Sequence, residues 1–246
     1  MSVLTLLLAG PLQSWGASAR FTRRTTEAAP TKSGVLGILA AAQGIQRGDD
    51  SRLAELAALR FGVRIDQPGT RIRDFQTAHH RVTGKSMPLS ERFYLADAVF
   101  TAALEGDHTL LTTLHNALRT PVYPTFLGRR SCPPARPVEL AVHDISLTRA
   151  LSDEPWHAAP WYQKLHRSNT PTVPLVVLRD TAPGDGYGET LRDHPLSFAA
   201  EHRRHALRTV ISETVDVPNP RAAIRPPAQR QPVPHHDPFG SLEDNP

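Results

Sequence analysis

The chain has 246 residues, of which 39% are hydrophobic and 21% charged, so it is long enough to bury the core of one large or two small domains. Basic residues exceed acidic ones by 28 − 24 = +4, a balance too small to indicate a polyanionic partner on its own. The single cysteine, Cys132, excludes an internal disulfide and a thiolate-rich zinc site, and this fits a reducing compartment.

The first element is a short apolar run over residues 3–9 that ends at Gly10, which predicts a buried strand. The run is too short for a signal core or a membrane span, so we expect a cytoplasmic protein that does not bind membranes. Thr31 predicts the start of a helix of small residues, and Gly44 predicts its end.

The loop between this strand and this helix is dense in cationic and aromatic side chains. Unpaired RNA bases stack on exposed rings beside arginines, at about 1–3 kcal/mol per base. Lys32 lies where the free N–H groups of the predicted helix would attract phosphate. We predict an RNA-binding segment here, and a solvated loop with incidental arginines is the alternative. The candidate residues are Gln13, Ser14, Trp15, Arg20, Phe21, Arg23, Arg24, Thr31, Lys32 and Ser33.

A long hairpin is predicted over residues 70–104. A short helix over 51–59 and a strand over 61–65 precede it, and its own strands cover 71–75 and 93–104. The polar segment between these strands places its tip away from the sheet. The basic candidates on this hairpin are Arg73, Arg81, Lys85 and Arg92.

A second amphipathic helix is predicted over residues 107–118, with Asp107 as its N-cap, and a closing strand is predicted within 138–147. The resulting order predicts an α+β fold with a ferredoxin-like βαββαβ domain, the fold that RNA-recognition modules also use. Between this helix and the closing strand lies a loop with paired guanidinium groups and following prolines. Its RNA-binding candidates are Gly128, Arg129, Arg130 and Ser131, and a loop with salt bridges to the fold is the alternative.

The remaining chain predicts a small β-rich C-terminal lobe over residues 148–217, with strands over 174–179 and 206–217. The aromatic-rich stretch 152–170 gives no clear fold. Residues 218–246 are rich in proline and poor in apolar residues, which predicts a disordered tail. The predicted divisions are therefore 1–147 for the RNA-binding domain, 148–217 for the lobe and 218–246 for the tail.

Four motifs in order resemble the CasD family, the subunit of type I-E CRISPR Cascade that binds the 5′ handle of the crRNA. They are AGPLQSWG at 9–16, PTKSGVLGILAAAQGI at 30–45, RDFQT at 73–77 and FLGRRSCP at 126–133. The resemblance covers residues 4–134 and weakens beyond 138. It implies a non-catalytic subunit whose handle-facing elements are residues 13–16, the loop ending at 23–24, residues 31–33 and the loop 128–131.

The same resemblance implies partners besides the crRNA. The hairpin from 73 to 92 would be a thumb that meets the adjacent backbone subunit of Cascade. The large subunit would dock nearby during recognition of target DNA, so contact with DNA would be indirect.

Two other functions stay open at this point. The first is a metal-independent endoribonuclease that processes crRNA, with His79 and His80, near Lys85, as its candidate acid and base. The second is a scaffold whose basic surface binds acidic proteins. We expect no cofactor and no metal, because no carboxylate or cysteine completes a metal site with His202 and His205.

Overall fold

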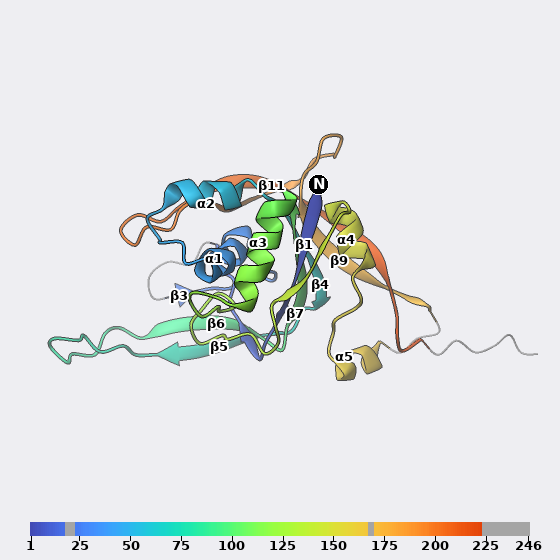
Figure 1. The fold of residues 1–246 in the computed structure, drawn as a ribbon. Coiled ribbons are helices and arrows are strands. Elements are labelled where there is room, and N and C mark those ends of the chain that lie inside the picture. The colour runs from blue at the N-terminus through green and yellow to red at the C-terminus, as the bar shows by residue number, and fades with distance from the viewer. Residues whose placement is uncertain (18–22, 167–169, 223–246) are drawn as a thin grey trace, which may run out of the picture.

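The computed structural model describes residues 1–17, 23–166 and 170–222, and its largest feature is a seven-stranded antiparallel sheet (Figure 1). The strand order is β10-β11-β9-β4-β7-β1-β8. Every paired neighbour in it runs antiparallel. The strands are β1 (Ser2–Ala9), β4 (Arg60–Gln67), β7 (Val99–Gly106), β8 (Glu139–His143), β9 (Thr172–Asp180), β10 (Glu189–Ser197) and β11 (Arg204–Pro218).

A second, smaller sheet carries the protruding hairpin. It consists of β2 (Leu12–Gln13), β3 (Arg23–Arg24), β5 (Thr70–Gln76) and β6 (Ser90–Ala96). β5 and β6 pair along their whole length, and their tip projects far from the rest of the chain in Figure 1. The structure thus has a projecting hairpin where the sequence predicted one.

Helices cover both faces of the large sheet. They are α1 (Lys32–Ala42), α2 (Asp50–Ala57), α3 (His108–Arg119), α4 (Leu147–Asp153) and α5 (Pro160–Leu165). The predicted N-caps are confirmed, because Thr31 Oγ1 accepts from the Gly34 N–H at 3.2 Å and Asp107 Oδ1 accepts from the Leu110 N–H at 2.9 Å. Within the described ranges, every helix is too short or too polar to cross a membrane.

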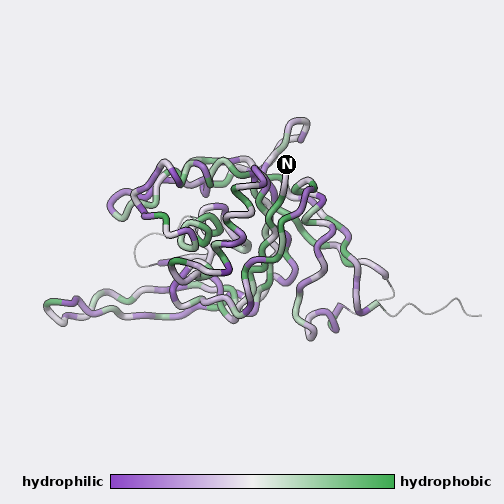
Figure 2. Tube along the Cα trace, viewed as in Figure 1, coloured by the Kyte–Doolittle hydropathy of each residue, from purple (hydrophilic) through white to green (hydrophobic). Residues whose placement is uncertain are grey.

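The strand β1 is buried along its full length, as its continuous apolar run predicted. Its side chains alternate between the two faces of the sheet: Leu4, Leu6 and Leu8 belong to the large core with α1 and α3, whereas Val3 packs with Leu151 of α4 on the other face. Hydrophobic stretches accordingly gather in the central strands and in α1 (Figure 2). A strand covered on both faces needs apolar residues at successive positions, and this explains the absence of alternation in its sequence.

Two strand predictions are corrected by the structure. Residues 93–104 are not one strand, because the chain takes a positive φ of 56° at Asp97 and passes from the small sheet into the large one. The strand β10 was not predicted at all. Its sequence contains Pro195 and several charges, and two irregularities interrupt its pairing with β11, at 191–194 and at 195–197.

The predicted C-terminal lobe contributes strands to the same large sheet. β9 pairs with β4 at Gly62, Val63 and Arg64, so the hydrogen-bonded ladder continues from the N-terminal half into residues 172–218. The predicted domain boundaries stay a prediction. Most of the predicted disordered tail, residues 223–246, lies outside the described residues.

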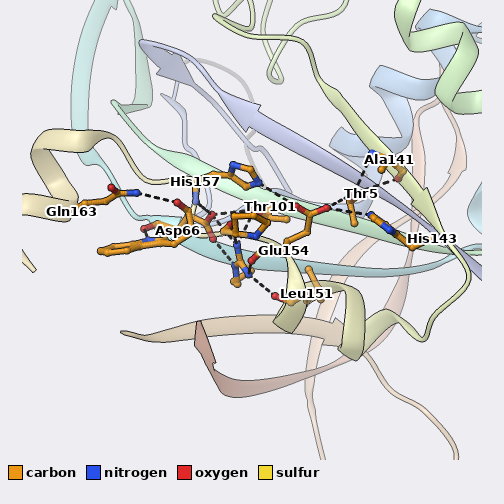
Figure 3. A network of polar contacts seen from close by, with 12 residues as sticks. Thr5, Asp66, Thr101, Ala141, His143, Leu151, Glu154, His157 and Gln163 are labelled. Carbon is orange, nitrogen blue, oxygen red and sulfur yellow. Dashed lines mark hydrogen bonds and ion pairs between the residues drawn. The ribbon is translucent and has the colours of Figure 1, made fainter. Parts of the chain in front are cut away.

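A buried polar network explains how the stretch without a predicted fold is attached to the sheet (Figure 3). Arg64 is fully buried and donates to both carboxylate oxygens of Asp66, at 2.7 and 3.1 Å. Its guanidinium also donates to the carbonyl oxygens of Leu151, Glu154 and Pro155 at 2.6–2.7 Å. One sheet arginine therefore fixes the chain that follows α4.

Glu154 is the second centre of this network. Its carboxylate accepts from Thr5 Oγ1 at 2.8 Å, and the rings of His157 and His143 lie 3.3 and 3.4 Å from it. Burial alone would raise the pKa of Glu154, but the hydrogen bonds from His157 and Thr5 and the charges of the two histidines lower it overall.

The Arg64→Met substitution should destabilise the protein by about 3–5 kcal/mol, because it leaves the buried Asp66 carboxylate without its charge partner. Urea unfolding followed by circular dichroism measures the loss. The matched control is Arg149→Met, which removes an exposed ion pair with Asp153 and should change stability by less than about 1 kcal/mol. If both substitutions lowered the free energy of unfolding equally, the buried network would stabilise the fold no more than an exposed ion pair does.

The Glu154→Gln substitution should flatten the loss of stability in acid. Since the folded-state pKa of Glu154 lies below its ordinary value of 4.5, the carboxylate stabilises the fold above pH 4.5, and this contribution is lost as the pH falls through the folded-state pKa. Thermal melting at a series of pH values from 7 to 3 tests this. The variant should be less stable than the original protein at pH 7, and the two should converge in acid. The control is Glu55→Gln at an exposed position, which should change the stability at pH 7 by less than about 0.5 kcal/mol.

Candidate nucleic-acid interface

A large open cleft, with a volume of about 2120 Å³, brings together segments that are distant in the chain. Six residues of α1 line part of it: Ser33, Gly34, Gly37, Ile38, Ala40 and Ala41. One wall, which we call the near wall, consists of the lining residues that lie within 14–17, 24–31 and 126–130. The other, the far wall, consists of lining residues from β10, β11 and the turn between them. The cleft gathers these predicted RNA-binding residues: Ser14, Trp15, Arg24, Thr31, Ser33, Gly128, Arg129 and Arg130.

The near wall depends on a close approach between two backbones. The Ser14 N–H donates to the Leu127 carbonyl at 3.0 Å, and the Leu127 N–H donates to the Cys132 carbonyl at 2.7 Å. Gly128 has a φ of 92°, and a Cβ there would lie 1.7 Å from the Ser14 carbonyl oxygen. Only glycine fits this position, so the loop has a fixed shape.

The arginines of the near wall have different surroundings. Arg129 Nη2 donates to the Arg24 carbonyl at 2.8 Å, and its guanidinium lies 4.7 Å from the centre of the Tyr94 ring. Arg129 Nη1 is buried without a hydrogen-bond partner among the described atoms. The side chains of Arg24 and Arg130 have no carboxylate partner in the described part of the chain, and both residues are exposed. Arg129 thus joins the loop to β3, and the other two arginines are available to a ligand.

The expectation that Trp15 presents an exposed ring is wrong. The side chain is 0% exposed, and its Nε1 donates to Gln13 Oε1 at 3.1 Å. Gln13 is buried as well and donates to the Leu8 and Ala98 carbonyls at 3.0 and 2.7 Å. A Cβ on Gly34 would lie 2.8 Å from the Trp15 ring, so the small residue in α1 makes room for the indole. Both side chains support the cleft from beneath.

The prediction that free N–H groups at the start of α1 bind phosphate is also wrong. The Lys32 N–H donates to Asp193 Oδ2 at 2.8 Å, so a carboxylate already lies there. The Lys32 side chain is 4% exposed and pairs with Asp180 at 3.0 Å. Burial lowers the pKa of Lys32, and the Asp180 carboxylate partly offsets this. Lys32 therefore ties α1 to β9 instead of facing the cleft.

The hairpin candidates lie outside the cleft. Arg81 and Lys85 are exposed at the tip, and Arg73 lies 4.7 Å from the Phe75 ring centre with Glu91 3.9 Å away. Arg92 is beside Arg24 in the register of β3 and β6, outside the cleft lining. The other candidates outside the lining are Arg23, whose guanidinium is 5.5 Å from the Phe93 ring centre, and Ser131, 3.4 Å from the Tyr94 hydroxyl. Arg20 and Phe21 lie outside the described residues.

The histidines of the hairpin tip take part in local turn contacts. His80 Nδ1 accepts from the Thr83 N–H at 3.2 Å, and His79 Nδ1 lies 3.3 Å from the Gly84 carbonyl oxygen. No carboxylate among the described residues pairs with either ring. These contacts shape the turn and give no support to an acid–base pair.

Sequence reasoning missed the far wall. It contains four arginines and a histidine: Arg192, Arg203, Arg204, Arg208 and His205. The sequence does not predict β10, and His202 and His205, which flank Arg203 and Arg204, are weighed there only as metal ligands. The density of arginine and histidine in residues 202–208 was the available signal.

Comparisons with known proteins agree with this architecture. A sequence profile of the family described as CRISPR-associated protein (Cas_Cas5) matches residues 3–211. The CRISPR system Cascade subunit CasD of Escherichia coli (strain K12) is 37% identical over 157 residues, which cover 56% of this chain and 70% of that protein.

Two solved structures are similar over most of their length. A chain of a CRISPR RNA-guided surveillance complex gives a TM-score of 0.72 at 33% identity and covers 88% of this chain and 91% of its own. A crystal structure of a Cas protein gives a TM-score of 0.68 at 34% identity and covers 89% and 99%.

Fold and sequence together define a protein of the CRISPR-associated class, with a mixed α+β architecture and large antiparallel sheets. The chain belongs to the Cas5 family, and the resemblance to CasD that its ordered motifs indicated is confirmed.

The Trp15→Ala substitution should lower the free energy of unfolding by about 3–5 kcal/mol, because it opens a cavity in the core beneath the near wall. Chemical denaturation measures the change. Trp161→Ala is the matched control, since this ring is 51% exposed, and its loss should cost about 1 kcal/mol or less. A fully stable Trp15→Ala protein would contradict the buried role.

Proposed function

We propose that this protein is the non-catalytic subunit of a type I-E CRISPR surveillance complex that binds the 5′ handle of the crRNA in its arginine-lined cleft. The observation that carries the proposal is that Arg24 and Arg129, 105 residues apart, meet in one wall beside Arg130. Similarity to CasD supplies the class of complex. Arginine forks match phosphate oxygens in pairs, so such a wall suits the backbone of an RNA strand.

The unpartnered Nη1 of Arg129 supports a bound anion at the near wall. A buried donor without a partner is costly, and a phosphate oxygen would satisfy it. Gly128 lets this loop pack directly on the backbone of Ser14, which fixes the positions of Arg129 and Arg130 at the near wall. We infer that Arg24, Arg129 and Arg130 contact the handle, and that Gln13, Ser14, Trp15 and Lys32 hold the wall in place, since Ser14 is 3% exposed and its hydroxyl donates to the Phe93 carbonyl at 3.1 Å.

The fold fits this proposal. The order β4-β7-β1-β8, with α1 following β1 and α3 following β7, supports a ferredoxin-like layout. We propose this layout for the N-terminal half. The β5–β6 hairpin, with Arg73, Arg81, Lys85 and Arg92, is the proposed thumb that meets the neighbouring backbone subunit, and the large subunit docks nearby in the cytoplasmic complex.

The Arg24→Ala/Arg130→Ala double variant should bind handle RNA about a hundredfold or more weakly, because it removes two charge-assisted hydrogen bonds that contribute about 1.5 kcal/mol or more each. The salt slope of binding should fall by about 1.4, since each phosphate contact to a single strand contributes about 0.7. Filter binding of purified protein to a labelled RNA from the 5′ handle region of the repeat, at several salt concentrations, measures both.

The control is the Arg52→Ala/Arg119→Ala double variant, which removes the same charge from exposed positions outside the cleft. It should leave the salt slope within about 0.3 of the original value. The proposal fails if the two double variants behave alike. Recovery of the RNA cut at a defined position in EDTA would instead favour a processing endoribonuclease.

A further inference from the structure

The far wall of the cleft is built by β10, β11 and the turn that joins them. Irregular pairing at 191–194 and 195–197 interrupts the hairpin, and such bulges bend and twist a strand. β10 packs against α1 and α2, so the hairpin lies over these helices. In Figure 1 its end lies on the same side of the molecule as β3 and the β5–β6 hairpin.

The charges on the far wall fall into two groups. Arg208 is held between two carboxylates, with donors 2.6 Å from Asp180 Oδ1 and 2.6 Å from Asp193 Oδ1, so it belongs to the fold. Arg192 and Arg203 are exposed and lack a carboxylate partner within the described ranges. Two exposed guanidinium groups thus line the cleft, and no ion pair among the described residues uses their charge.

The balance of charge in the cleft favours an anion on both sides. Its described lining contains eight arginines and three carboxylates, Glu27, Glu189 and Asp193. Asp193 is already neutralised by Arg208. Arginines of the near wall and of the far wall therefore add to one positive field across the cleft.

The far wall also contains aromatic rings and an exposed apolar side chain. The rings of Phe198 and His205 lie 6.5 Å apart, and Leu196 beside them is 46% exposed. Burial lowers the pKa of His205, and the neighbouring Arg203 lowers it further. The imidazole is consequently neutral near pH 7, and an uncharged ring of this kind stacks on a base.

We propose that the far wall is a second RNA-contacting surface, in which Arg192 and Arg203 bind phosphates and Phe198 with His205 stacks on an unpaired base. The inference rests on the proposed function, because it assigns the same strand to both walls. Free guanidinium groups beside flat rings fit single-stranded RNA better than an acidic peptide, which has no bases to stack. The handle would thus lie between two elements that are separated by most of the chain.

The test compares three variants in the filter-binding assay on the full chain with the same labelled handle RNA. Arg192→Ala/Arg203→Ala should lower the salt slope by about 1.4 and weaken binding about tenfold. Phe198→Ala should weaken binding at least about fivefold with the salt slope unchanged, because stacking involves no counterion release. Arg52→Ala/Arg119→Ala is the charge-matched control, and melting curves confirm that each variant is folded.

The outcomes separate this inference from the proposed function. If the near-wall double variant Arg24→Ala/Arg130→Ala loses affinity and slope while the far-wall variants match the control, the inference is overturned and the proposed function stands. If only the far-wall variants lose affinity, the inference holds and the near-wall assignment fails. If every variant matches the control, both are overturned.

Discussion

The approach of the loop around Gly128 to the backbone of Ser14 is the contact on which the near wall depends. It places two segments that are more than one hundred residues apart at hydrogen-bonding distance. Trp15 fills the space beneath, and Arg129 joins the loop to β3 above. A polar and cationic surface is held rigidly because an apolar side chain and a glycine lie directly under it. Without that support, the arginines would sit on independent loops.

The second structural constraint is a set of buried charges that connect the halves of the chain. Lys32 and Arg208 share Asp180, and Arg208 also pairs with Asp193, which in turn accepts from the backbone of α1. These ions are neutralised locally, so they set the geometry of the cleft without adding to its field. Positive charge available to a ligand comes from other arginines, on the cleft edges.

Sequence reasoning predicted those elements whose signals are local. The apolar run of β1 and the caps Thr31 and Asp107 are read from neighbouring residues, and the structure agrees with them. The break at Asp97 and the strand β10 were missed, because a positive φ and an irregular edge pairing depend on distant partners. The burial of Trp15 and Lys32 differs from the prediction for the same reason: it depends on Gly34 and Asp180, which no local pattern connects to them.

The continuous sheet has a consequence for how the protein can be divided. β9 pairs directly with β4, and β11 and β10 continue the ladder outward. A chain shortened to residues 1–147 would leave β4 as an unprotected edge with free N–H and C=O groups, which is a template for intermolecular pairing. Its far wall would be lost at the same time. The C-terminal strands therefore cover the edge of β4, and they also form the far wall of the cleft.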